Sequence, residues 1–144
     1  MGFGLGAAIG TQFANPDKRV FNIAGDGCFH MNSIELATLR DYGIPVIEVI
    51  INNHALGMVR QWQNLFFEKR FSQTAISHAT DFHRLAEAYQ IKAFTVTQPE
   101  EVDSALREAI ALREPVVINC EVSPDDNVFP ITPPGAGIDE LVLG

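Results

Sequence analysis

Short apolar runs alternate along the chain with segments that repeat apolar residues at helical spacing. The runs contain many β-branched residues and predict strands at 19–24, 45–51, 91–96 and 115–120. The first, second and fourth of these are expected to be buried. The repeating segments predict helices at 32–42, 57–67, 82–89 and 102–110. Strands that alternate with helices indicate a three-layer α/β fold, in which a mainly parallel sheet lies between two layers of helices.

Several of these elements have recognisable ends. Gly43 and Pro45 close the helix at 32–42, because glycine favours the helix C-terminus and proline cannot continue the helix. Asp81 is placed to cap the helix that follows it. The segment Thr97-Gln-Pro-Glu100 predicts a capping box, with proline in the first turn of the next helix.

The chain of 144 residues is long enough for one domain with a single core. Residues 1–14 are small and mostly apolar and predict a loop that runs into a tightly packed helix, whereas 68–80 predicts an irregular surface segment. Residues 128–139 contain several prolines and glycines, which exclude regular structure. We therefore predict a domain at 1–127 and a C-terminal arm at 128–144.

Two polar motifs follow directly after two of the predicted strands. Gly25-Asp26-Gly27 follows the first strand, and Asn52-Asn53 follows the second after 24 intervening residues (28–51). Since a right-handed crossover makes these strands parallel, Asp26 and Asn53 should lie at the same carboxyl edge of the sheet, where ligands of α/β folds bind. A carboxylate oxygen and a carboxamide oxygen suit Mg²⁺, which takes its remaining ligands from phosphate and water.

The backbone around Asp26 is suited to a diphosphate. Gly25 and Gly27 have no Cβ, so their backbone can approach phosphate oxygens closely, and the N–H groups after Gly27 would open the next helix. Either motif alone would more often be an ordinary turn or loop. Together, at this spacing and after apolar runs, they favour a site that holds Mg²⁺ against a diphosphate.

The charge and the cysteines limit the possible functions and compartments. The formal net charge of −8 argues against a nucleic-acid partner, which requires a basic surface. Cys28 and Cys120 lack the spacing of a zinc site or of a disulfide framework, so a reducing cytoplasm is the simplest compartment. No apolar stretch approaches the length of about 18 residues that a membrane span needs.

The motif Gly25-Asp-Gly27 with Asn52-Asn53 resembles the thiamine-diphosphate binding motif of the thiamine-dependent enzymes. Within that superfamily, three further segments are similar to the biosynthetic acetolactate (acetohydroxyacid) synthases: Met1 to Gly10, Gly57 to Phe66 with its Gln-Trp-Gln sequence, and Pro133 to Gly137. The resemblance covers nearly the whole chain. It implies the fold of the diphosphate-binding domain of these enzymes.

The resemblance also implies roles for individual residues. Asp26 and Asn53 would bind Mg²⁺ through their side chains, and Ala55 through its main-chain carbonyl. The cofactor itself would contact a set made up of Met1, Gly25, Asp26, Gly27, Cys28, Asn53, Gly57 and Met58. Val59 would lie near the reacting carbon, and Trp62 would pack on the second 2-ketoacid; without the resemblance, Met58 and Trp62 would be interpreted as an ordinary buried helix face.

The resemblance implies that the chain holds only part of an active site. The resemblance implies that the activating glutamate comes from a pyrimidine-binding domain. In this chain, Glu35 lies on a predicted crossover helix and Glu48 in the middle of a predicted strand, so neither is expected to reach the cofactor. No catalytic residue is therefore expected in this chain. FAD would belong to a further domain of the parent enzyme, which we expect to be a homo-oligomer acting on 2-ketoacids. Other thiamine-dependent enzymes, of the glyoxylate carboligase or pyruvate oxidase type, and a non-catalytic cofactor-binding module are the alternatives.

Overall fold

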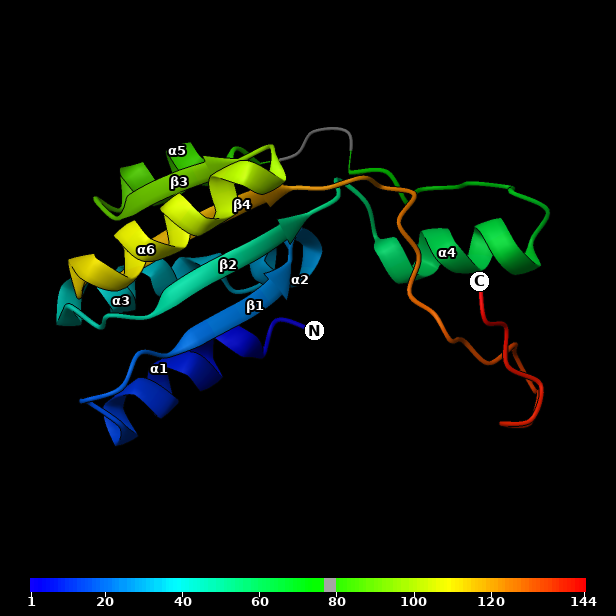
Figure 1. Cartoon of the computed structure of the whole chain (residues 1–144), viewed down its shortest axis with the longest axis horizontal. Helices are drawn as coiled ribbons and strands as arrows, with labels where there is room; N and C mark the ends of the chain where they lie inside the picture. Colours follow the sequence, from blue (N-terminus) through cyan, green and yellow to red (C-terminus); the bar gives the residue numbers. More distant parts are fainter. Residues whose placement is uncertain (77–79) are drawn as a thin grey trace. The chain divides into compact units, whose positions relative to one another are not determined.

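The computed structural model describes residues 1–76 and 80–144 and contains a four-stranded sheet. Its strands are β1 (Phe21–Gly25), β2 (Ile47–Asn52), β3 (Lys92–Val96) and β4 (Val116–Glu121). They lie side by side in the order β1-β2-β4-β3, and all three pairs are parallel (Figure 1). The predicted α/β fold with a parallel sheet is confirmed.

Each predicted helix is present, some with a short 3₁₀ turn in front. The helices are α1 (Gly4–Ala14), α2 (Asp26–His30), α3 (Leu36–Tyr42) after η1 (Ser33–Glu35), α4 (Gly57–Phe66), α5 (Phe82–Ala88) and α6 (Val102–Leu112) after η2 (Pro99–Glu101). The sequence pattern did not indicate α2 as a separate helix. No helix in the described part of the chain has the length and apolarity needed to cross a membrane.

The described residues form two compact units. The first comprises residues 1–53 and 80–122 and holds the sheet with α1, α2, α3, α5 and α6. The second comprises residues 54–76 and 123–144 and holds α4 with the C-terminal segment. The predicted division into a domain at 1–127 and an arm at 128–144 stays a prediction.

Helices cover both faces of the sheet in the first unit, because alternate side chains of a strand point to opposite faces. On one face, α1, α2, α3 and α5 pack over a core that includes Leu36, Leu39 and Ile50. On the other face, α6 packs its Ala105 and Ala109 against β2, β3 and β4. The unit thus has the three predicted layers (Figure 1).

Strand β1 is less buried than its apolar composition predicts. Phe21 is 41 % exposed and Ile23 is 71 % exposed, whereas Ile47 and Ile50 of β2 are fully buried. The difference arises because β1 lies at the edge of the sheet, and the core beneath α6 is built from the other three strands. The prediction that residues 19–24 form a buried strand is therefore wrong as to burial.

The predicted capping box is displaced by one residue. Gln98, not Thr97, is the N-cap, and Glu101, not Glu100, completes the box by accepting a hydrogen bond of 3.0 Å from the Gln98 N–H. A residue before proline avoids the helical conformation, and Gln98 accordingly has φ −130° and ψ 145°. The helix can therefore begin only at Pro99.

Asp81 caps α5 as predicted, since its Oδ1 accepts a hydrogen bond of 3.0 Å from the Arg84 N–H. We expect Asp81→Ala to lower the free energy of unfolding by about 1 kcal/mol, measured by urea denaturation. Asp81→Asn retains an accepting oxygen but loses the exposed ion pair with Arg84, so it should cost little. Equal losses in the two variants would contradict this role.

Candidate functional site

The two sequence motifs lie at the same edge of the first unit. Strands β1 and β2 are parallel neighbours, and their last register pair is Gly25 with Ile51. Asp26 therefore follows β1 directly and Asn53 follows β2 directly, both at the carboxyl edge of the sheet. The predicted placement of these residues is observed, while their role as metal ligands stays a prediction.

The Asp26 side chain is nearly buried and is held in place by a hydrogen bond. The residue is 5 % exposed, and its Oδ1 accepts a hydrogen bond of 2.8 Å from the Gly27 N–H. It is also the first residue of α2, where a negative charge complements the positive end of the helix dipole. A Cβ added to Gly25 would meet no atom within 4 Å, so the space in front of this backbone is open.

Three further polar residues, Asn52, Asn119 and Glu121, lie near the carboxyl ends of β2 and β4 and are joined by hydrogen bonds. The sequence motifs did not indicate this cluster. The Glu121 carboxylate accepts hydrogen bonds from the Asn52 amide at 3.1 Å and from the Asn119 amide at 2.7 Å. Asn52 is 1 % exposed and Asn119 is 5 % exposed. These contacts join the carboxyl ends of β2 and β4. A polar residue at position 119, inside the apolar run 116–120, was the signal that could have indicated them.

The N-terminal segment passes close to α2. Gly2 has φ +70°, and a Cβ at this position would lie 3.0 Å from the Cβ of Met31 and 3.9 Å from the carbonyl oxygen of Cys28. Glycine is therefore required here for both conformation and space. Met1, which precedes it, is 82 % exposed, and Cys28 is half-buried.

The remaining predicted site residues belong to the second unit. Ala55 is buried and forms an antiparallel bridge with Ala75, and the Leu56 N–H donates a hydrogen bond of 2.8 Å to the Thr74 carbonyl. These contacts fix the segment that leads into α4, which begins at Gly57.

One side of α4 faces a cavity. The cavity has a volume of about 380 Å³ and is lined by Met58, Val59, Trp62, Gln63, Phe67 and Arg70. Met58 and Val59 are half exposed, and Trp62 packs edge-on against Phe66 with ring centroids 5.8 Å apart. The structure thus brings Met58, Val59 and Trp62 together in a largely apolar cavity. Gln63, Phe67 and Arg70 were not predicted.

The comparisons with known proteins agree on one family. The family model described as "Thiamine pyrophosphate enzyme, C-terminal TPP binding domain" matches residues 1–120. The chain is 42 % identical over 143 residues to the acetolactate synthase large subunit of Porphyra purpurea. It is 41 % identical over 142 residues to the acetolactate synthase isozyme 2 large subunit of Escherichia coli K12. In each case 99 % of this chain is covered, and it spans about a quarter of the relative.

A solved structure of a thiamine diphosphate-dependent enzyme has a similar fold. The thiamine diphosphate-dependent 4-hydroxybenzoylformate decarboxylase of Rhodococcus jostii RHA1 superposes with a TM-score of 0.79 at 31 % sequence identity. The match covers 85 % of this chain and 23 % of that enzyme.

Proposed function

The chain belongs to the thiamine pyrophosphate enzymes, as their C-terminal TPP binding domain, and we propose that it binds the diphosphate of this cofactor together with Mg²⁺. The observation that carries the proposal is the position of Asp26 and Asn53, which follow two adjacent parallel strands at one edge of the sheet. Ligands of open parallel sheets bind at this carboxyl edge.

The donor set fits Mg²⁺. The ion prefers hard oxygen ligands in octahedral array and usually takes only a few of them from protein. We assign the side chains of Asp26 and Asn53 and the main-chain carbonyl of Ala55 as protein ligands. The diphosphate and water complete the coordination. A buried carboxylate also compensates the charge of the cation, which favours a divalent ion at this place.

The backbone near Asp26 is assigned to the diphosphate. The open space in front of Gly25 leaves room for phosphate oxygens, and the N–H groups of Gly27 and Cys28 open α2. Because the chain has a net charge of −8, the ion and the backbone dipoles must supply most of the compensation for the negative diphosphate. Met1, Gly57 and Met58 complete the proposed cofactor-binding set.

The proposed reaction is that of an acetolactate synthase, in which two 2-ketoacids are joined after one is decarboxylated. When bound, the thiazolium ring of the cofactor supplies the electron sink for this chemistry. This chain holds the cofactor's tail, and the carboxylate that activates its aminopyrimidine comes from another domain. In support, Glu48 is buried and bound to Asn22, and Glu35 accepts a hydrogen bond from Thr38.

The cavity beside α4 is proposed to receive the second 2-ketoacid. Val59 and the flat ring of Trp62 form an apolar wall, which can favour one additional methyl group by about 1–3 kcal/mol. Pyruvate and 2-ketobutyrate differ by one methylene group, so this wall is suited to discriminate between them. Two of the most similar relatives are acetolactate synthase large subunits, which supports this substrate class.

The partners follow from the same proposal. The chain spans about a quarter of its curated relatives, so we propose that it acts with a pyrimidine-binding domain or subunit, in a cytoplasmic homo-oligomer. FAD, where the parent enzyme holds it, is assigned to a further domain and not to this chain.

The purified chain alone is expected to form no acetolactate from pyruvate, even with saturating Mg²⁺ and thiamine diphosphate. The reason is that, in this proposal, the carboxylate that activates the aminopyrimidine comes from another domain. A colorimetric acetolactate assay measures this, with a complete acetolactate synthase as the positive control. Product formation above the protein-free background would show that the activating group lies within this chain.

A further inference from the structure

Two glutamines flank Trp62 on α4, and each pairs its side chain with the backbone N–H and C=O of one residue in an irregular segment. Gln61 donates from Nε2 to the Val128 carbonyl at 2.7 Å and accepts from the Val128 N–H at 2.9 Å. Gln63 donates to the Ser72 carbonyl at 3.1 Å and accepts from the Ser72 N–H at 3.2 Å. Both carboxamides therefore exchange two hydrogen bonds with a backbone, as paired strands do.

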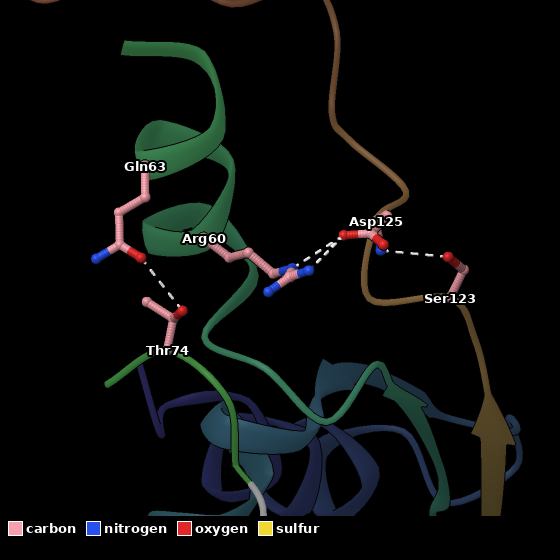
Figure 2. A network of polar contacts seen from close by, with 5 residues as sticks. All are labelled: Arg60, Gln63, Thr74, Ser123 and Asp125. Atoms are coloured by element: carbon pink, nitrogen blue, oxygen red, sulfur yellow. Dashed lines mark hydrogen bonds and ion pairs between the residues drawn. The ribbon is translucent and has the colours of Figure 1, made fainter. Parts of the chain in front are cut away.

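Further polar contacts extend these two pairs. The Gln63 Oε1 also accepts a hydrogen bond of 3.2 Å from the Thr74 hydroxyl, and Thr74 is 2 % exposed (Figure 2). Arg60 donates from Nε and Nη2 to Asp125 at 3.0 and 2.6 Å, and the Ser123 hydroxyl accepts from the Asp125 N–H (Figure 2). The Arg60 guanidinium also lies 4.3 Å from the ring centroid of Phe71.

The second unit depends on these contacts because it has hardly any apolar core. Among its described residues only Ala55, Gln61 and Thr74 are buried, and two of these three are polar. Hydrophobic burial therefore contributes little to holding residues 69–74 and 123–128 against α4. The paired hydrogen bonds must do so, and for Gln61, which is 3 % exposed, a carboxamide left unsatisfied is more costly than the bond itself is stabilising.

We propose that Gln61 and Gln63 are positioning residues that fix residues 123–128 and 69–74 to α4 and thereby set the place of this helix, which carries Trp62 in the wall of the cavity. That the cavity receives a 2-ketoacid rests on the proposed function; the positioning itself does not. At pH 7 a carboxamide can both donate and accept in this arrangement. A carboxylate of the same shape accepts but cannot donate, so it would face the Val128 carbonyl with repulsion.

Trp62 reports on this arrangement directly, because it is the only tryptophan of the chain. The test compares the wild type with Gln61→Glu, and with Gln73→Glu as a control that makes the same charge change at an exposed residue of the same unit. At pH 7 we expect Gln61→Glu to increase acrylamide quenching of Trp62 about twofold and to accelerate hydrogen exchange of the Val128 amide about tenfold or more. The control should match the wild type.

Acidification shows whether loss of the donated hydrogen bond causes these changes. Below about pH 4 the introduced carboxyl becomes protonated and can again donate and accept, so Gln61→Glu should regain the wild-type quenching and exchange. Unchanged quenching at pH 7, an equal change in the control, or no recovery on acidification would each overturn the proposal. Gln63→Glu, monitored at the Ser72 amide, provides an independent second variant should Gln61→Glu leave the unit unfolded.

The ligand assignment is tested separately with the wild type. Titration with 2-ketobutyrate is expected to quench Trp62 in a saturable manner. Saturable quenching supports both the cavity assignment and the positioning of Trp62 within it. If quenching is absent while the Gln61→Glu results are as expected, the proposed ligand is wrong and the positioning role of the glutamines stands.

Discussion

Replacing Asp26 with alanine is expected to abolish the Mg²⁺-dependent binding of thiamine diphosphate to this chain. Asp26 supplies the charged oxygen of the proposed ligand set, and its loss leaves Mg²⁺ with one neutral side-chain oxygen and a carbonyl. Changes even to groups that only support metal ligands lower metal affinity by about 10–100-fold, so loss of the charged ligand should cost about 100-fold or more. Isothermal titration calorimetry with thiamine diphosphate, with and without Mg²⁺, measures this.

Two further variants make this experiment specific. Asp17→Ala removes the same charge from an exposed position of the same unit and should bind like the wild type. Asp26→Asn keeps an oxygen but not the charge, so it should retain weak binding. If Asp26→Ala bound the cofactor with the same Mg²⁺ dependence as the wild type, the ion would be held elsewhere and the proposed ligand set would be wrong.

Replacing Glu48 with glutamine is expected to stabilise the fold at alkaline pH. Glu48, the second residue of β2, is fully buried, and both its oxygens lie within 2.9 Å of the Asn22 amide nitrogen. Burial raises the pKa of this carboxyl from 4.5 to about 8, and the hydrogen bond from Asn22 only partly opposes the rise. A glutamine has nearly the same shape and carries no charge at any pH.

The sign of the pH dependence follows from this pKa. Between pH 4.5 and about 8 the folded state holds a proton that the unfolded state has released, so stability falls as the pH rises through this range. Above pH 8 the Glu48 carboxyl is charged in the folded state as well. The cost of burying this charge is then about 3–5 kcal/mol for a pKa shift of this size. Glu48→Gln should therefore raise the free energy of unfolding by that amount at pH 9 and change it little at pH 4.5.

Urea denaturation at the two pH values tests this prediction, with Glu114→Gln as the control at an exposed glutamate of the same unit. The control should change stability little at either pH. An equal effect of Glu48→Gln at both pH values would mean that Glu48 titrates like an exposed carboxyl.

The sequence predicted those parts of the fold that depend on local pattern. The apolar run 45–51 predicts β2 because a strand buried on both faces needs apolar residues throughout. The same reasoning is wrong about the burial of β1. Ile23 is exposed because β1 lies at the edge of the sheet, and the sequence of the strand does not indicate this position. Which strand lies at the edge is decided by the order of all four strands. The capping box moved by one residue because Pro99 restricts Gln98, a local effect that the motif alone does not include.

In the candidate site, too, some residues could be placed from the sequence and others could not. Asp26 and Asn53 could be placed from the sequence, because each follows a strand and the crossover between them determines that the strands are parallel. The pairing of Gln61 with Val128 could not, since 67 positions separate the two residues and Val128 lies in a segment without regular structure. Glu48 was recognised as a mid-strand residue, but its partner Asn22 depends on the register between β1 and β2.

The central claim is that the carboxyl edge of this sheet holds Mg²⁺ and the diphosphate of thiamine diphosphate. Amide NMR spectra of the 144-residue chain, recorded while thiamine diphosphate is added in the presence of Mg²⁺, test it most directly because they detect weak binding and locate it. The account predicts saturable shifts of the Gly25, Gly27, Cys28 and Asn53 amides that require Mg²⁺ and are absent in Asp26→Ala. Shifts confined to other parts of the chain, or equally large without Mg²⁺, would contradict it.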